Sequence, residues 1–330
     1  MSDSPTVVVG IPTYNNAEDI ASTFDILESQ THPPDRVVFC DKSDDRTPEL
    51  IAEWSETVPF PVDIVEQSGT GVADAYDTIL STIEGEYDIF VTLQTEITVD
   101  ADWLSLHVET HDDHPDIGIV NGDNKWHDPT DREVDPDDRP YYVGRNFSAK
   151  AGVLESIDGW DANFLRGEDW DMRIRLAGQG VRSYARTELG YSWQREPESY
   201  VTLSKAKRKP TSLTFLSKFG PWYLTFHPSH VVADALSVGA VAAGALAILT
   251  LPIPVSSLLW ALVFALLVAV YWVAHVTLRG HVQGNWGLGI VRKQLLNGIA
   301  VFYAARRLAG GHPEWNTAGF DPEETPNFKF

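Results

Sequence analysis

Cysteine is almost absent from this sequence, because Cys40 is the only one in 330 residues. A single cysteine has no partner within the chain, so a fold held together by internal disulfides is excluded. Basic residues are also few: 25 Lys and Arg stand against 47 Asp and Glu, and the formal net charge is −22. Duplex binding depends largely on Lys and Arg that neutralise phosphates, so this composition argues against general nucleic-acid binding.

The scarce basic residues are unevenly distributed. Residues 1–200 contain 42 acidic and 14 basic residues, with only three lysines, whereas residues 201–330 contain 5 acidic and 11 basic residues. A dense shell of solvated carboxylates keeps a protein soluble in concentrated salt, and this pattern indicates a haloarchaeal cytoplasm for the first part. The two parts are expected to face different environments.

The second part contains two long runs without Asp, Glu, Lys or Arg, 235–251 and 255–278. A helix of about 20 apolar residues crosses about 30 Å of hydrocarbon, so the runs predict two transmembrane helices. Pro252 and Pro254 lie between them and predict a tight helical hairpin; two buried helices of a soluble domain are the alternative. By the positive-inside rule, the flanking basic residues keep both flanks and the acidic domain in the cytoplasm. These residues are Lys205, Lys207, Arg208, Lys209, Lys218 and Arg279.

Two further segments favour the membrane surface. Residues 200–230 combine five Lys and Arg with leucine and aromatic residues, the composition of a basic amphipathic linker on an anionic leaflet. Residues 285–308 are apolar but interrupted by Arg and Lys, which suits an interfacial helix better than a spanning one. No cleavable signal peptide is expected. The predicted division is a cytoplasmic domain at 1–199, the linker at 200–230 and a membrane region at 231–330.

The first 190 residues alternate short β-branched runs with helical stretches, which is typical of a mostly parallel sheet covered by helices. The predicted strands are Thr6–Ile11, Arg36–Cys40, Val62–Glu66, Asp88–Leu93 and Ile117–Asn121. The predicted helices are Ala17–Gln30, Thr47–Glu56, Val72–Glu84 and Trp103–His111. Ligands of such sheets bind at the carboxyl ends of the strands, so residues directly after each strand are candidates for a binding site.

Polar and small residues follow each of the first four predicted strands. They are Pro12, Tyr14 and Asn15 after the first strand, Asp41 and Ser43 after the second, Gly69 after the third, and Gln94, Thr95 and Glu96 after the fourth. Taken singly, each group predicts no more than a turn or a helix cap. Together they are expected to line one edge of the sheet.

Four segments, in this order, resemble family 2 glycosyltransferases. VVVGIPTYN resembles the family's first strand and turn, VVFCDKSDDRTPELI its second strand and acidic turn, and YDIFVTLQTEITVDADWL the segment that bears its D-x-D motif. GWDANFLRGEDWDMRIRLAGQGVRSYA is similar to the family's acceptor-side signature. The resemblance covers about residues 5 to 200. It implies the GT-A fold, an α/β nucleotide-sugar-binding domain with a mostly parallel sheet.

The resemblance also implies a donor pocket and a general base. Asp41 is expected to accept a hydrogen bond from the nucleotide base, although an ordinary surface acid is the alternative. The same pocket is expected to include Pro12, Tyr14, Asn15, Ser43, Gly69, Gln94 and Thr95. Asp169 is the expected base for the acceptor hydroxyl, with Glu168 in reserve; favourable charge at a helix N-terminus is the alternative. The acceptor side is expected to include Arg145, Asn146, Trp170 and Arg195.

The metal site departs from the family pattern. Gln94, Thr95 and Glu96 replace the D-x-D triplet, so the Glu96 carboxylate alone is expected to bind Mg²⁺ or Mn²⁺. Many relatives carry a late histidine that has no counterpart in residues 191–195, which predicts a weakened metal site or partial replacement of the metal by Arg195. The Q-x-x-R-W element of polymer-forming relatives is also missing, which favours a single sugar addition.

An anchored cytoplasmic glycosyltransferase favours a lipid-bound acceptor. We predict inverting transfer from a UDP- or GDP-linked sugar to an oligosaccharide on dolichol phosphate. The setting resembles N-glycan assembly for haloarchaeal surface-layer proteins, which is an analogy of setting. One alternative is an enzyme that loads the first sugar onto dolichol phosphate. Another is a non-catalytic relative that binds nucleotide sugar, which the replaced triplet allows.

Overall fold

The computed structural model describes residues 4–83, 85–122, 131–135, 146–194, 203–250, 253–279, 288–311 and 313–326. The chain forms two compact units, Met1–Pro197 with Trp315–Phe330, and Glu198–Glu314. The composition of the sequence predicts a boundary at residue 199 and a membrane region that extends to residue 330. In the structure, residues 315–326 pack on the first unit instead.

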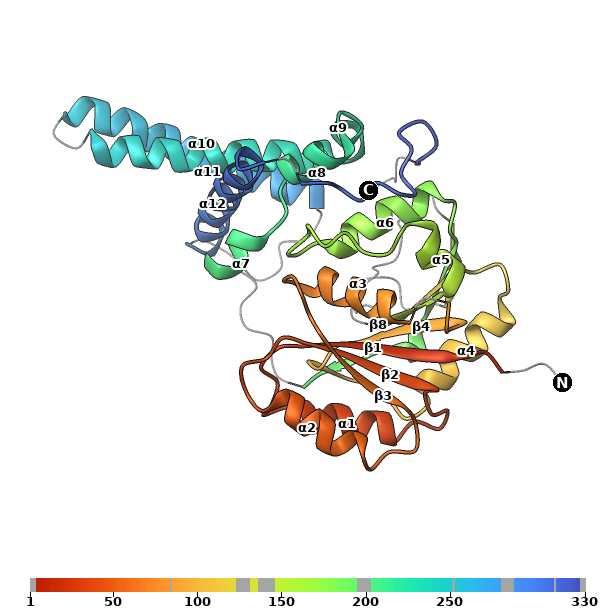
Figure 1. Ribbon diagram of the computed structural model, residues 1–330. Helices are drawn as coiled ribbons and strands as arrows, with labels where there is room; N and C mark the ends of the chain where they lie inside the picture. Colours follow the sequence, from red (N-terminus) through yellow and green to blue (C-terminus); the bar gives the residue numbers. More distant parts are fainter. Residues whose placement is uncertain are drawn as a thin grey trace. The chain divides into compact units, whose positions relative to one another are not determined.

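The first unit is built on an eight-stranded sheet in the order β3-β2-β1-β4-β8-β6-β9-β7 (Figure 1). The strands are β1 (Val7–Thr13), β2 (Arg36–Asp41), β3 (Val62–Glu66), β4 (Ile89–Leu93), β6 (Ile119–Gly122), β7 (Arg132–Val134), β8 (Asn146–Lys150) and β9 (Ser183–Arg186). The first four strands are parallel, and β8 runs antiparallel to β4 and β6. A separate antiparallel pair joins β5 (Ile97–Thr98) to β10 (Ser192–Trp193).

Helices cover both faces of the sheet because the strand side chains alternate. Val7 and Val9 of β1 belong to the core on one face, with residues of the first, second and fourth helices, whereas Val8 belongs to the core on the other face. The helices are α1 (Ile20–Glu28), α2 (Thr47–Ser55), α3 (Val72–Thr82), α4 (Trp103–Asp113), α5 (Ala151–Ser156) and α6 (Glu168–Gly178). In Figure 1, α1 and α2 lie on one side of the sheet and α3 and α6 on the other.

Every predicted strand forms, with ends shifted by at most two residues. The four predicted helices also form, and α1 begins at Ile20 rather than Ala17. Strands β7 to β9, which extend the sheet beyond β4, were not predicted, because they are short and lack a clear apolar alternation. The expectation of a GT-A-like α/β unit with a mostly parallel sheet is confirmed.

The second unit is helical. Its helices are α7 (Leu203–Arg208), α8 (Ser212–Phe219), α9 (Trp222–Phe226), α10 (Pro228–Leu249), α11 (Pro254–Arg279) and α12 (Leu288–Ala309). Residues 200–230 are predicted as a linker, but the described part forms α7 to α9 and buries aromatic side chains. Phe215 and Tyr223 stack with ring centroids 5.0 Å apart. This segment therefore belongs to the core of the second unit.

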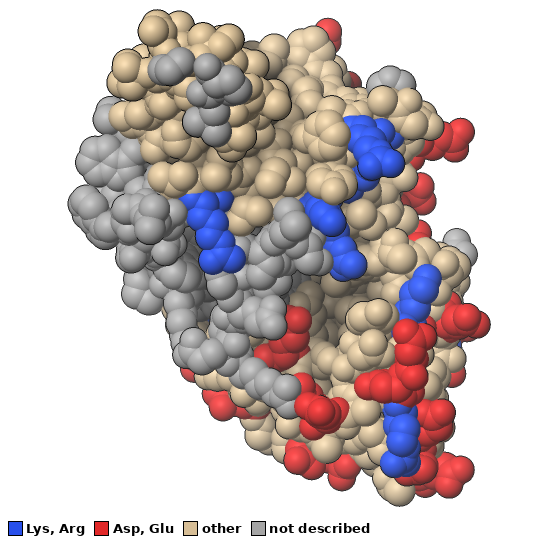
Figure 2. Space-filling view, turned by 90° about the vertical axis from the view of Figure 1, so that its left-hand side faces the viewer, with Lys and Arg blue, Asp and Glu red and all other residues tan. Residues whose placement is uncertain are grey.

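α10 and α11 pack against each other in opposite directions. A Cβ at Gly239 would contact the Leu267 side chain, and a Cβ at Gly244 would contact the Phe264 side chain. Among the described residues, only α10 is long and apolar enough to cross a membrane, and the described apolar stretch of α11, Val255–Tyr271, is shorter. A transmembrane hairpin is therefore not shown. Figure 2 shows acidic side chains over the first unit and an end of the α10 and α11 pair without charged side chains.

The first helix of this pair begins earlier than predicted. α10 starts at Pro228 rather than residue 235 and includes Asp234, whose charge excluded this turn from the predicted run. The Asp234 carboxylate is 3% exposed and accepts a hydrogen bond from the Ser212 N–H at 2.8 Å. This partner allows a buried acid within an otherwise apolar helix.

α12 packs against other helices of the second unit. The Gln294 side chain is fully buried and donates to the carbonyl oxygens of Leu236 and Leu267 at 3.3 and 3.4 Å. At Gly298, a Cβ would lie 2.7 Å from the Ser237 carbonyl oxygen. One face of α12 is thus buried within the second unit, so the predicted interfacial helix is not shown.

Candidate active site

The carboxyl ends of β1 and β2 hold a buried carboxylate. Thr13 and Asp41 are partners across these parallel strands, and Asp41 is 7% exposed. Its Oδ1 accepts hydrogen bonds from the Thr13 and Ser43 hydroxyls at 2.6 and 2.7 Å, and its Oδ2 accepts one from the Ser43 N–H at 2.9 Å. Three donors fix the position of the carboxylate and stabilise its charge. Asp41 is therefore a built feature of this edge and not an ordinary surface acid.

The turn after β1 is joined to the turn after β2. The Asn15 N–H donates to Ser43 Oγ at 2.8 Å, and Asn15 Oδ1 accepts from the Asp44 N–H at 2.8 Å. Asn15 adopts a left-handed conformation with φ of 54°, which asparagine tolerates better than most residues. The neighbouring Tyr14 side chain is 63% exposed. The structure thus brings together Tyr14, Asn15, Asp41 and Ser43, with an aromatic ring open to a ligand.

The turn after β3 completes this group of loops. The Lys42 ammonium donates to the carbonyl oxygens of Gly69 and Ser68, a tie that sequence reasoning missed. The Gly69 N–H donates to the Asp74 carboxylate at 3.0 Å. A Cβ at Gly69 would lie 2.2 Å from Asp74 Oδ1, so a larger residue here would displace the Asp74 carboxylate. Gly69, as predicted from its place after the strand, lies in a loop tied to the Asp41 turn.

The Gln94-Thr95-Glu96 triplet lies after β4. Thr95 is buried, Gln94 is half-buried and Glu96 is exposed. The Gln194 N–H donates to the Glu96 carbonyl oxygen at 2.9 Å, next to the pairing of β5 with β10. The late segment expected to lack a metal-binding histidine therefore does lie beside the triplet.

The described residues do not fit a metal site built by the protein alone. Within them, no group of three or more His, Cys, Asp or Glu side chains could hold a metal ion. Glu96 offers one exposed carboxylate, whereas Mg²⁺ held through one or two carboxylates relies on substrate phosphates for its other ligands. A metal at this site would therefore depend on the diphosphate of a bound donor.

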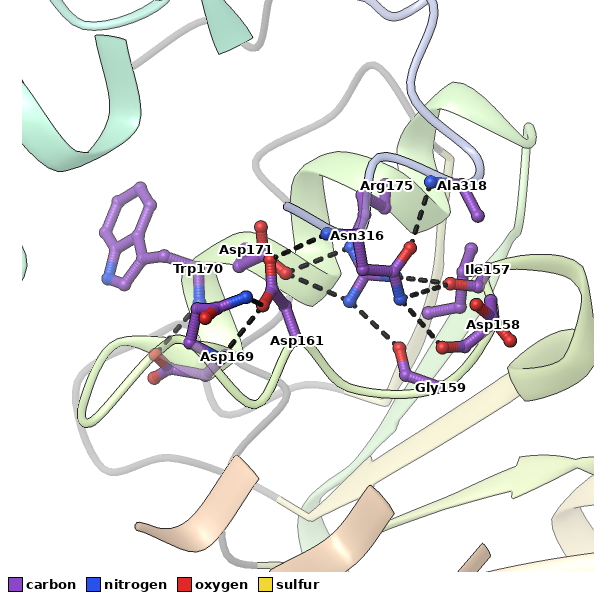
Figure 3. A network of polar contacts seen from close by, with 11 residues as sticks. Ile157, Asp158, Gly159, Asp161, Asp169, Trp170, Asp171, Arg175, Asn316 and Ala318 are labelled. Carbon is purple, nitrogen blue, oxygen red and sulfur yellow. Dashed lines mark hydrogen bonds and ion pairs between the residues drawn. The ribbon is translucent and has the colours of Figure 1, made fainter. Parts of the chain in front are cut away.

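A second set of carboxylates lies at the start of α6. Glu168, Asp169 and Asp171 occupy its first turn, where acids are stabilised by the helix dipole, after Gly167 with φ of 79°. Asp171 is fully buried and pairs with Arg175 at 2.9 Å, so its charge is committed to structure (Figure 3). Asp169 and Glu168 are half-buried, and Asp169 Oδ1 accepts from the Trp170 N–H at 2.9 Å. Of the three acids, the first two remain candidates for a general base.

The donor loops and the loop before α6 are in contact. A Cβ at Gly71, which has φ of 97°, would lie 3.4 Å from Leu165 Cα and 3.6 Å from the Phe164 carbonyl oxygen. The backbone conformation favours glycine here, and the two distances are ordinary van der Waals contacts. The segment leading to Asp169 therefore lies beside the loop that follows β3.

The predicted acceptor-side residues fare differently. Asn146 is 4% exposed, and its amide accepts from Trp103 Nε1 at 2.7 Å and donates to the Leu189 carbonyl oxygen, so its side chain has a structural role in the core. Trp170 is half-buried, with the Arg173 guanidinium 5.0 Å from its ring centroid. Arg145 and Arg195 lie outside the described residues.

A buried histidine pair behind the sheet was not predicted as a unit. His107 contacts Asn146 and Ser148, and His111 contacts Ser148 at 2.9 Å. Burial lowers the pKa of His107 to about 3 and that of His111 to about 4. Both imidazoles are therefore neutral at physiological pH and tie α4 to β8.

Residues 8–154 match the model of Glycosyl transferase family 2. The matched residues all lie in the first unit. Its fold is shared with the mannosyltransferase PcManGT from Pyrobaculum calidifontis in complex with GDP-Man and Mn²⁺, at 19% identity and a TM-score of 0.56 over 93% of this chain and 88% of that chain. It is also shared with S. aureus TarS 1–349 in complex with UDP, at 14% identity and a TM-score of 0.52 over 92% of each chain. No curated protein matches the chain.

Proposed function

We propose that this protein is an inverting glycosyltransferase that uses a nucleotide-sugar donor. One observation carries the proposal: the buried, triply hydrogen-bonded Asp41 ends β2, the half-buried Asp169 begins α6, and the loops beside them approach each other at Gly71 and Leu165. A site that holds a nucleotide needs a fixed acceptor for the base, and a transfer site needs a carboxylate that can take a proton.

The proposed reaction is a single displacement at the anomeric carbon. Asp169 takes the proton of the acceptor hydroxyl while the acceptor oxygen forms the new bond to that carbon. The bond to the diphosphate oxygen breaks, and its electron pair leaves with the nucleoside diphosphate. Glu168, the neighbouring acid, is the second candidate for the general base. Asp41 holds the nucleotide, with Pro12, Tyr14, Asn15, Ser43, Gly69, Gln94 and Thr95 around it.

The donor belongs to the UDP- or GDP-linked sugars. PcManGT was crystallised with GDP-Man and TarS with UDP, and both proteins share the fold of this chain. A divalent cation, Mg²⁺ or Mn²⁺, is proposed to be held by Glu96 together with the donor's diphosphate, as the Mn²⁺ in the PcManGT crystal suggests by analogy. Such an ion would supply positive charge for the leaving group.

The acceptor is proposed to be an oligosaccharide on dolichol phosphate at the cytoplasmic membrane face. The enzyme would add a single sugar to it. The apolar α10, with 22 residues and a mean hydropathy of 2.0, supports a membrane location, and α11 is proposed as the second span. The acidic first unit supports a halophilic, archaeal setting, in which surface-layer N-glycans would be the product. Loading of the first sugar onto dolichol phosphate is the alternative reaction.

The test is transfer of radiolabelled sugar from a panel of UDP- and GDP-sugars into chloroform-extractable lipid, using membranes in molar KCl. Bare dolichol phosphate and glycosylated dolichol phosphate are supplied as separate acceptors. Label on the glycosylated lipid alone supports extension, and label on bare dolichol phosphate supports the alternative. No label from any donor contradicts the proposal.

A second candidate function is nucleotide-sugar binding without catalysis. The observation that favours it is the replacement of the first metal carboxylate by Gln94, with Glu96 exposed beside it. It predicts nucleotide-sugar binding by the purified protein in the absence of any transfer. The half-buried carboxylates at the start of α6 favour catalysis, because a binding protein has no use for a base there.

A further inference from the structure

The chain returns to the first unit after the helices of the second. Residues Trp315–Thr325, here called the return segment, pack on α6 and on the loop before it. The Thr325 side chain is 5% exposed. A Cβ at Gly178 near the end of α6 would lie 2.1 Å from the Gly319 carbonyl oxygen, and Gly319 itself has φ of 83°. Two glycines thus allow the backbones to touch, which a loosely attached tail would not require.

Asn316 is the centre of this contact (Figure 3). Its Nδ2 donates to the carbonyl oxygens of Ile157 and Asp158 at 3.2 and 2.7 Å, and its Oδ1 accepts from the Ala318 N–H at 3.0 Å. Its backbone N–H donates to Asp161 Oδ2 at 3.1 Å. One residue of the return segment therefore holds three residues of the loop between α5 and α6, Ile157, Asp158 and Asp161.

The same loop is also held by α6. Arg175 donates to the carbonyl oxygens of Ile157 and Gly159 while it pairs with Asp171 (Figure 3). The Ile157 carbonyl oxygen thus accepts from both Arg175 and Asn316. Two sets of hydrogen bonds therefore hold the loop, one from α6 and one from a segment about 160 residues later in the chain.

The contact continues toward the proposed base. Asp161, 3% exposed, accepts from the Asn163 N–H and Nδ2 at 2.9 and 2.8 Å as well as from the backbone of Asn316. The ring of Trp315 lies 5.5 Å from that of Phe164, whose carbonyl oxygen faces Gly71 of the donor loops. Three residues after Phe164, Gly167 begins α6 with Glu168 and Asp169.

We propose that the return segment positions the loop of residues 157–169, and that Asn316 is a positioning residue for Asp169. The proposal rests on the proposed function for the role of Asp169, but the contact itself does not. Without the Asn316 side chain, the loop keeps its hydrogen bonds from Arg175 and loses those that the return segment donates to the carbonyl oxygens of Ile157 and Asp158. Asp169 is then less well aligned with the acceptor hydroxyl, whereas the Asp41 turn is untouched.

The test compares full-length Asn316→Ala with full-length Thr317→Ala, an exposed neighbour whose side chain serves as the matched control. Hydrogen exchange is expected to become faster in residues 157–169 of Asn316→Ala and to stay unchanged in the sheet. The kcat for transfer is expected to fall about tenfold, with the KM for the nucleotide sugar within about twofold. Thr317→Ala should match wild type in every measurement.

Unchanged exchange in residues 157–169 of Asn316→Ala would overturn the proposal. So would faster exchange throughout the first unit, because Asn316 would then be a general stability residue, and so would an unchanged kcat. If the wild-type enzyme transfers no sugar, the proposed function fails, and the exchange comparison alone decides whether Asn316 positions the loop.

Discussion

Two buried aspartates have different roles in this protein. Asp41 accepts only from uncharged hydroxyl and N–H donors in the described contacts, whereas Asp171 is paired with Arg175. A carboxylate without a fixed cation has charge left to interact with a ligand, and one paired with arginine has little. Residue identity alone does not separate these roles, since each depends on which side chains the fold brings to the carboxylate.

Asp41→Ala is expected to weaken nucleotide binding about tenfold, because the base loses its acceptor and two hydroxyls lose their partner. The kcat at saturating donor should change much less. Titration calorimetry with UDP and GDP gives the dissociation constants. Asp44→Ala, an exposed acid three residues on, is the control and should bind like wild type. Equal weakening in both variants would remove Asp41 from the nucleotide site.

Gln94→Asp restores a second carboxylate beside Glu96. Two hard oxygen ligands hold Mn²⁺ more firmly than one, so the variant should require several-fold less added Mn²⁺ for half-maximal transfer. Activity is measured against Mn²⁺ concentration after treatment with a chelator. Gln94→Asn keeps a neutral amide and is the matched control. If neither wild type nor Gln94→Asp responds to the chelator, the assignment of Glu96 to a metal is wrong.

At the scale of elements, the first half of the first unit could be predicted well and the rest could not. β1 to β4 and α1 to α4 carry clear alternation and helix periods, as in Val7 to Val9 against the two cores. β8 and β9 are five and four residues long and pair with β4 and β6 across about 50 to 65 residues of chain, which no local pattern encodes. The start of α10 depended on the pairing of Asp234 with the Ser212 backbone.

The packing of α3 against the loop before α6 buries Asp77, which lowers the free energy of unfolding at neutral pH. Burial, with the nearby Asp158 and Asp74 carboxylates, raises the pKa of Asp77 to about 6. The folded state therefore binds this proton more tightly than the unfolded chain, whose pKa is 3.8, and stability falls as the pH rises from 3.8 to about 6. Asp77→Asn should stabilise the protein by about 1 kcal/mol at pH 7.5, since partial exposure reduces the full effect of the shift.

The measurement is chemical denaturation of wild type and Asp77→Asn at pH 4 and pH 7.5. The gain from the substitution should be present at pH 7.5 and nearly absent at pH 4, where the folded wild type already binds the proton. Asp113→Asn, at an exposed site, is the control. A gain of the same size at both pH values would show that the carboxylate charge is not its source.

At the scale of the whole molecule, the order of the two units followed from charge and hydropathy, but the path of the chain did not. The acidic first part and the apolar second part are visible in composition alone. The return of residues 315–326 to the first unit is not, because that segment has no periodic pattern and is held by backbone contacts at Gly178 and Gly319 and by Asn316. The candidate base Asp169 was found through motif resemblance, and its support by the return segment required the structure.

The proposed function requires the first unit to transfer sugar with Asp169 as its general base. The most direct measurement is single-turnover transfer by wild type and Asp169→Asn, with nucleotide-sugar binding measured on the same preparations. The amide fills the same space but cannot take the proton, so transfer should fall at least a hundredfold while the dissociation constant for the nucleotide sugar stays within about twofold. Retained transfer, or a loss of binding as large as the loss of transfer, would contradict the account.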